Sequence, residues 1–319
     1  MCSAEVRTWG TGGAFGREFG LNAKQRKARQ RRGHSSASLI VAGRNIVIDA
    51  GAHCSEMMID NEAPLPELVL LTHGHPDHVG GLNQLANSRK RSLVLKSGDP
   101  GALPAPLMVI ATPQCLRQGP HAVAKRFANL DPIVQWVAIP TLNTWYAVDG
   151  TSPALTPSDQ AARSAVGPFI EFKAMPVLHT DQMLGSCMYV FRVTDPAGRS
   201  KRVIFSGDFA SMEEEVLNDP DLQKANMAVL ETNTIKAPGT GHSTLAKNVE
   251  ILRRWYDDED TAVILLTHLS GYEDCTRGSY DHVPDDDDWL REVSDAKDRG
   301  DIPDKLTVTI AHDAGQYPL

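Results

Sequence analysis

A short loop near residue 75 concentrates side chains that bind metal ions. The stretch LLTHGHPDHVGGL at 70–82 places His73, His75, Asp77 and His78 within six positions and holds three of the chain's eleven histidines. Imidazole nitrogen and carboxylate oxygen are the donors that a divalent ion such as zinc prefers. Burying several imidazoles beside a carboxylate without a partner would be costly. The pattern predicts a metal site, with His73 and His75 facing one ion and Asp77 and His78 facing a second.

Further donors come directly after other apolar runs of the sequence. These runs are IVIDAG, PVLHT, IFSGDFA and ILLTHLS, and their donors are Asp49, His179, Asp208 and His268. The carboxyl ends of strands gather on one edge of a sheet, where active-site loops of layered α/β proteins lie. Alone, each residue would be read as a turn former or as hydrogen-bonded structure. Together with the 70–82 loop they predict a two-metal set.

The rest of the chain must supply strands and helices that position these donors. Val-, Ile- and Leu-rich runs that end in Gly, Asp, His or Thr predict strands. These runs lie at 6–10, 38–41, 45–51, 67–73, 107–113, 169–179, 188–193, 202–208, 227–232, 262–268 and 306–313. The segment 242–258 has helical apolar spacing with Ser243 as the expected N-cap, and 79–88 and 114–130 also favour helices. This mixture predicts layered α/β architecture with mixed sheets.

Composition limits the class of protein. The chain has 319 residues and a formal charge of −8, which argues against a general nucleic-acid binder. Its five cysteines form no CxxC pair, and no apolar run reaches the ~20 residues of a membrane helix. We expect a cytoplasmic protein of one domain, 1–319, with an insertion at about 115–168 that includes a long loop at 141–168. A homodimer is left open.

A basic stretch and a glycine-rich stretch each allow two interpretations. The run AKQRKARQRR at 23–32 carries six basic residues, which form a solvated helix face or steer an anionic phosphate. GTGGAFG at 10–16 is a weak phosphate-binding motif and more simply a strand with its turn. The acidic runs 257–260 and 285–288 are expected to be solvated surface.

The order of the metal-binding motifs resembles the metallo-β-lactamase fold superfamily. That resemblance implies a four-layer αββα sandwich with two mixed sheets and two divalent ions at one edge. The ions are expected to be zinc, with manganese or iron left open. The implied ligands are His73, His75 and His179 for the first ion, and Asp77, His78 and His268 for the second, with Asp208 bridging. Asp49 is expected to orient a ligand histidine through its ring N–H.

A second resemblance narrows the chemistry to phosphodiesters. LETNTIKAPGTGHSTLAKNVEILRRW resembles the phosphodiesterase branch, notably tRNase Z, with Glu231 and His242 as the matching residues. The N-terminal and C-terminal segments of the chain resemble the cyclic phosphodiesterase of phosphonate breakdown and its PQQ-biosynthesis relative. Those families carry a cysteine cluster for a structural zinc, whereas this chain has REFGLNAKQRKARQRR there. No structural zinc is therefore expected.

The predicted activity is hydrolysis of a cyclic nucleotide, a cyclic phosphate or RNA by attack of a hydroxide shared by two metals. Asp77, Glu231 and His242 are the candidate catalytic residues. A carboxylate such as Glu231 can hold an imidazole in its charged form, and that imidazolium can protonate a leaving alkoxide. A lactonase or thioesterase on the same metals, and a metal-binding member without turnover, are the alternatives.

Overall fold

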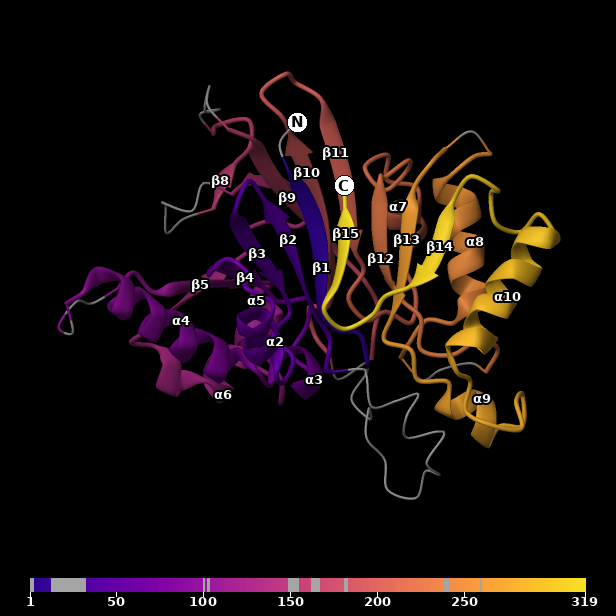
Figure 1. Ribbon diagram of the computed structural model, residues 1–319, viewed down its shortest axis with the longest axis horizontal. Helices are drawn as coiled ribbons and strands as arrows, with labels where there is room; N and C mark the ends of the chain where they lie inside the picture. The colour runs from indigo at the N-terminus through magenta and orange to yellow at the C-terminus, as the bar shows by residue number, and fades with distance from the viewer. Residues whose placement is uncertain are drawn as a thin grey trace.

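Two β-sheets stack face to face, and helices cover both outer faces (Figure 1). The computed structural model describes residues 3–12, 33–99, 101, 104–148, 155–161, 167–180, 183–237, 241–258 and 260–319. Its layers confirm the predicted αββα sandwich with two mixed sheets. The basic run 23–32 and the glycine-rich turn beyond Gly12 lie outside the described residues.

The first sheet has the strand order β15-β1-β2-β3-β4-β5-β6. Its strands are β1 (Ala4–Gly10), β2 (Ser36–Val41), β3 (Arg44–Ile48), β4 (Pro66–Leu70), β5 (Leu107–Ala111), β6 (Val134–Ala138) and β15 (Gly315–Pro318). Pairing is antiparallel from β15 to β3 and parallel from β3 to β6. The parallel half directs the carboxyl ends of its strands to one edge.

The second sheet has the order β14-β13-β12-β11-β10-β9-β7-β8. Its strands are β7 (Trp145–Ala147), β8 (Thr156–Pro157), β9 (Phe169–Pro176), β10 (Cys187–Thr194), β11 (Ser200–Phe205), β12 (Met227–Glu231), β13 (Val263–Thr267) and β14 (Thr307–Ile310). Strands β11 to β14 are parallel, and the pairs from β11 to β8 are antiparallel.

The helices form two groups, one on each side of the sheet pair (Figure 1). Beside the first sheet lie α2 (Cys54–Asp60), α3 (Pro76–Val79), α4 (Leu82–Ser97), α5 (Pro113–Arg117), α6 (Val123–Arg126) and the 3₁₀ turn η1 (Ala128–Leu130). Beside the second lie α7 (Glu214–Leu217), α8 (Leu245–Trp255), α9 (Tyr272–Thr276) and α10 (Asp286–Asp298). Among the described residues, no helix combines the length and apolar character needed to cross a bilayer.

Alternation along the strands divides the apolar side chains among three cores. In β3, Ile46 and Ile48 face the space between the sheets, while Val47 packs with the helices outside the first sheet. In β12, Val229 points between the sheets and Leu230 packs toward α8. Successive side chains of a strand point to opposite faces, so a run that is apolar at every position is buried on both.

Each of the eleven predicted strands overlaps an observed one, but four observed strands were not predicted. These are β6, β7, β8 and β15; β7 and β8 have only three and two residues, and β15 contains Gly and Pro. The expected loop at 141–168 contains β7 and β8, which extend the second sheet beyond β9. Pairing with a ready-made sheet edge, rather than local propensity, makes these segments strands.

Two helix expectations and one expectation of solvated surface need correction. Helix α8 is capped by Thr244, whose side chain accepts from Lys247 N, while the Ser243 hydroxyl donates to Asn248 Oδ1 instead. The segment 114–130 is broken into α5, α6 and η1, and Gly119, which adopts a positive φ, separates α5 from α6. The acidic run 285–288 is not simply solvated surface: Asp285 and Asp288 form the capping box of α10, and Asp288 is buried.

Candidate metal centre

The predicted donors come from the carboxyl ends of strands in both sheets. Asp49 follows β3 and the 70–82 loop follows β4, whereas His179, Asp208 and His268 follow β9, β11 and β13. Glu231 is the last residue of β12. Because these strand ends meet at one edge of the sandwich, residues far apart in the sequence converge there.

The first cluster consists of His73, His75, His179 and Asp208, each offering one ligand atom within 4.8 Å of the others. His75 Nδ1 lies 3.2 Å from His73 Nε2 and 3.1 Å from His179 Nε2. Asp208 Oδ2 lies 3.7 Å from His73 Nε2. Three imidazoles and a carboxylate facing one point match the donor set of a zinc site.

The second cluster shares Asp208 and adds Asp77, His78 and His268, again within 4.8 Å. His268 Nε2 lies 3.3 Å from Asp77 Oδ2 and 3.2 Å from Asp208 Oδ2. His78 Nε2 lies 3.3 Å from Asp208 Oδ1. The structure thus brings together the seven residues expected to hold two ions, with Asp208 between the two groups.

Two atoms of the two clusters have no hydrogen-bond partner within the described chain. His78 Nε2 and Asp208 Oδ2 are both buried and unpaired. Leaving buried polar atoms unpaired costs about 1–3 kcal/mol each, so such atoms point to a missing partner. A divalent ion between the clusters would satisfy both, and the donor set therefore fits the group that the sequence predicts.

The imidazoles of the first cluster are held neutral. Burial lowers the pKa of His75 and of His179 to about 4, and burial also puts the pKa of His73 well below its usual value. Burial opposes ionisation of Asp208, but the facing His268 and His78 outweigh it and keep the pKa of that carboxyl low. Neutral imidazole and ionised carboxylate are the forms that bind a metal ion.

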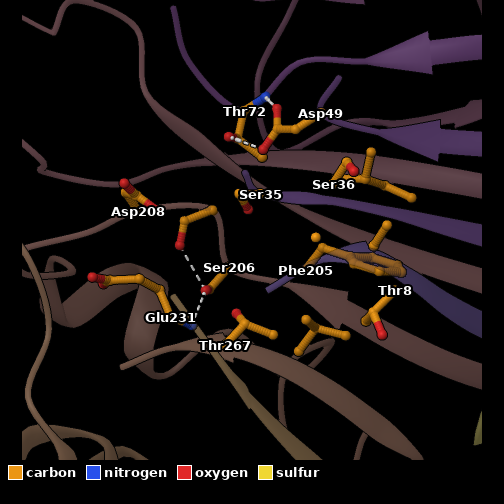
Figure 2. A pocket seen from close by; sticks show the side chains of 15 residues that line it. Thr8, Ser35, Ser36, Asp49, Thr72, Phe205, Ser206, Asp208, Glu231 and Thr267 are labelled. Atoms are coloured by element: carbon orange, nitrogen blue, oxygen red, sulfur yellow. Dashed lines mark hydrogen bonds between the residues drawn. The ribbon is translucent and has the colours of Figure 1, made fainter. Parts of the chain in front are cut away.

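Asp49 contacts Thr72 and His78 of the 70–82 loop. Its Oδ2 lies 2.7 Å from His78 Nδ1 and accepts from the Thr72 hydroxyl at 2.7 Å. Its Oδ1 accepts from Thr72 N at 2.8 Å, as the dashed lines of Figure 2 indicate. Asp49 itself adopts a positive φ of 59°. The carboxylate is placed to fix the His78 ring with Nε2 aimed into the centre.

Glu231 and His242 form a pair beside the second cluster. Glu231 Oε1 lies 2.8 Å from His242 Nδ1, and Glu231 Oε2 accepts from Ser243 N at 2.9 Å. His242 Nδ1 also lies 3.6 Å from Asp208 Oδ2. Burial opposes protonation of His242, but the Glu231 carboxylate outweighs it and raises the pKa of His242 to about 9. The raised pKa favours the imidazolium form of the ring at neutral pH.

A small polar cavity lies behind the centre, between the sheets (Figure 2). Carboxylates and hydroxyls line it, among them Asp49, Asp208, Glu231 and Ser206. The Ser206 hydroxyl accepts from Glu231 N at 2.9 Å and so fixes the end of β12. Asp49 and Glu231, the two carboxylates that contact His78 and His242, therefore line the same cavity.

The described part of the glycine-rich turn, Gly10 to Gly12, packs against the centre. A Cβ on Gly10 would lie 1.8 Å from the His34 carbonyl oxygen, so only glycine fits there. The Thr11 carbonyl accepts from His268 N at 2.7 Å. Thr11 N in turn donates to Asp313 Oδ1 at 2.9 Å, which ties the C-terminal segment to the same turn.

Sequence reasoning missed several residues that touch the centre. The Thr72 hydroxyl donates a hydrogen bond to Asp49. The only indication of this role in the sequence is the position of Thr72 directly before His73. The His121 ring lies 5.4 Å from the His75 ring, and Arg126 Nη1 donates to the Gly74 carbonyl at 2.7 Å. Both lie in the segment expected to be helical at 114–130, where nothing local indicates a contact with the metal loop.

Comparison with characterised proteins finds a partial relative. Over 86 residues the chain is 31% identical to the anti-Pycsar protein Apyc1 of Bacillus phage BSP38. The aligned part is 26% of this chain and 29% of the length of that relative.

Solved structures share the fold over nearly the whole chain. A diphosphatase from the PhnP family has a TM-score of 0.67 at 18% identity, covering 100% of this chain and 98% of its own. The short form of human tRNase Z has a TM-score of 0.57 at 15% identity, covering 98% of both chains. The chain also matches the β-lactamase superfamily domain over residues 44–269. With that match and this fold, the chain belongs to the metallo-β-lactamase superfamily of metal-dependent hydrolases.

Proposed function

We propose that this chain is a dinuclear metal-dependent phosphodiesterase. His73, His75 and His179 would hold one divalent ion, and Asp77, His78 and His268 would hold the other. Asp208 would serve both, since it is the one residue common to the two clusters. Zinc fits the donor set best, and manganese and iron accept the same ligands. Two such ions supply an activated water and neutralise charge on phosphoryl oxygens.

The observation that carries the choice of phosphodiesters is the Glu231–His242 pair. An imidazolium whose Nδ1 is held by a buried carboxylate at 2.8 Å has Nε2–H free to donate. A diester that expels an alkoxide needs a proton at its leaving oxygen, and a positioned acid supplies it. Thioester hydrolysis expels a weakly basic thiolate and places no comparable demand on a protonated group beside the ions. A lactone also expels an alkoxide, so the substrate test below separates it from a diester.

The remaining residues hold this arrangement in place. Asp49 orients His78 through its ring N–H, and Ser243 N and Phe209 N donate to Glu231 Oε2 at 2.9 and 3.3 Å. These bonds keep the carboxylate of Glu231 facing His242. Positioning of this kind lowers the cost of reaching the reactive geometry.

A cyclic nucleotide, another cyclic phosphate or RNA is the proposed substrate class. Two solved proteins with this fold carry names that refer to cleavage of phosphorus esters or anhydrides: a diphosphatase and a tRNase. That likeness agrees with the acid–base pair, which is the stronger support.

The test compares three substrate classes on one preparation. The protein is loaded with zinc or manganese and offered bis(p-nitrophenyl) phosphate, a lactone and nitrocefin. We expect turnover of the diester and none of the other two. Turnover of the lactone alone would contradict the proposal, and an Asp208→Asn variant should lose whichever activity depends on the ions.

A further inference from the structure

Asn233 touches a ring that the proposed centre uses, and the sequence assigned it no role although it lies inside the LETNT stretch. It lies two residues after Glu231, at the end of β12, and is 6% exposed. Its side-chain nitrogen Nδ2 lies 3.3 Å from Nδ1 of His268, and turning the amide over places Oδ1 there instead. The opposite nitrogen of that ring, Nε2, faces Asp77 and Asp208. Asn233 is therefore the polar side chain behind a candidate ligand, as Asp49 is behind His78.

The backbone of Asn233 is fixed on three sides. Its carbonyl accepts from Ser270 N at 3.0 Å and from Gly271 N at 2.8 Å, just after His268. Its N–H donates to the Ser243 carbonyl at 3.0 Å, just after His242. The side chain thus stands in a position set by two loops of the site, and it does not depend on its own contact with His268.

The tautomer of the His268 ring decides whether the Asn233 amide must donate or accept a hydrogen bond at Nδ1. A ring that donates the lone pair of Nε2 to an ion carries its proton on Nδ1 and requires an acceptor there. A ring that keeps its proton on Nε2 has a lone pair on Nδ1 and requires a donor. A primary amide carries one group of each kind and meets either need by turning over.

Glu231 is the competing acceptor for the Nδ1 proton. Its Oε1 lies 3.9 Å from His268 Nδ1, beyond hydrogen-bond distance, and is already engaged by His242 Nδ1 at 2.8 Å. Asn233 is closer and keeps the two imidazoles from sharing one carboxylate.

We propose that Asn233 is a positioning residue for His268, its amide oxygen accepting the Nδ1–H that His268 carries when Nε2 faces a divalent ion. The inference rests on the proposed two-ion function and adds to it a residue that favours binding of the second ion. Outer partners of this kind change metal affinity by about 10–100-fold.

Two substitutions separate an acceptor from a donor. Asn233→Asp keeps the size of the side chain and offers only acceptors, whereas Asn233→Ala offers neither. Zinc affinities of the stripped and refilled proteins are measured by competition with a chromophoric chelator, and bound zinc per chain by elemental analysis. Asn45→Ala is the matched control, since Asn45 is fully buried, bonds the Pro64 carbonyl at 2.7 Å and lies at the opposite end of β3 from the centre.

The expected pattern is specific to one ion. Wild type and Asn45→Ala bind two zinc ions; Asn233→Ala binds the first equally well and the second about 10–100-fold more weakly. Asn233→Asp retains the second ion, and a loss of that ion would count against the proposal even if the alanine variant does not fold. Unchanged second-ion affinity in Asn233→Ala, or its loss in Asn233→Asp, would overturn the role of Asn233 and leave the two-ion proposal standing. A wild-type chain that takes up fewer than two ions would overturn both.

Discussion

At the scale of single residues, the centre depends on pairs in which one member fixes the other. Asp49 holds His78, and Glu231 holds His242, with contacts of 2.7 and 2.8 Å. In both pairs a buried carboxylate is the anchor, at 3% and 2% exposure. A buried carboxylate is costly unless it is hydrogen-bonded, and each of these accepts backbone N–H bonds as well. The anchors are therefore set before any substrate arrives.

The role proposed for His242 predicts a dependence on the leaving group. His242→Ala should reduce kcat/KM by about 10²–10⁴-fold for a dinucleoside phosphate, which expels an alkoxide. The loss for bis(p-nitrophenyl) phosphate should be much smaller, because p-nitrophenolate leaves without a proton. Steady-state kinetics on the two diesters measures the difference.

Glu231→Gln provides the companion variant for that experiment. Without the carboxylate, the pKa of His242 loses the contact that raises it, so the same selectivity between leaving groups should appear in weaker form. Equal losses on both diesters in the two variants would contradict a proton-donating role.

At the scale of elements, the strand ends place the candidate metal ligands at one edge of the sandwich, and contacts to the loops fix their orientation. The 70–82 loop is joined to the second sheet through Cys187 N, which donates to the Thr72 carbonyl at 3.0 Å, and through the Tyr189 hydroxyl, which donates to the Leu71 carbonyl at 2.9 Å. On its outer side, Arg126 binds the loop at Gly74. The metal loop is thus held between the sheets and the α5–α6 segment.

The N-terminus of α10 predicts a stability change with pH. Burial raises the pKa of Asp288, but the Asp285 N–H, His282 and Arg291 outweigh burial and lower that pKa to about 2. Since the pKa falls on folding, the stabilisation is present above the ordinary value of 3.8 and is lost as the pH falls toward 2. We expect Asp288→Asn to cost about 1 kcal/mol of unfolding free energy near neutral pH.

Urea unfolding at pH 6 and pH 3 checks this expectation. The difference between wild type and Asp288→Asn should shrink at the lower pH. Asp287→Asn serves as the control, because Asp287 carries the same charge in the same turn but is exposed and is not part of the capping box. A difference that persists unchanged at pH 3 would argue against an ionised Asp288 as its source.

At the scale of the whole molecule, the candidate metal centre lies at the edge where loops of the two sheets meet. The first sheet supplies Asp49 and the 70–82 loop, and the second supplies His179, Asp208 and His268. Bound ions would therefore link the two halves of the sandwich in addition to serving chemistry.

Removing metal should destabilise the fold. A ligand that binds only the folded chain stabilises it by about 2.7 kcal/mol at a free concentration 100 times its Kd. We expect chelation to lower the Tm by several degrees, as measured by scanning calorimetry with and without zinc. Asp208→Asn, which alters the residue common to both clusters, should respond much less to chelator. An identical Tm for stripped and loaded wild type would contradict a linking role for the ions.

The sequence alone predicted eleven of the fifteen strands in the described residues, the order of the candidate ligand motifs and a metal site. A strand such as β12 is apolar at four successive positions because both its faces are buried, and His73, His75, Asp77 and His78 reveal their chemistry by type and spacing. These signals are local, so they can be read without coordinates.

Only the tertiary structure decided which distant residues meet. The contact of Asn233 with His268, of Thr72 with Asp49 and of His121 with His75 comes from loops of different strands and helices. Likewise β7 and β8 become strands because the edge of β9 is there to pair with them. A partner supplied from far along the chain leaves no pattern in the local sequence. For this reason the sequence points to the candidate ligands but not to most of the side chains that contact them.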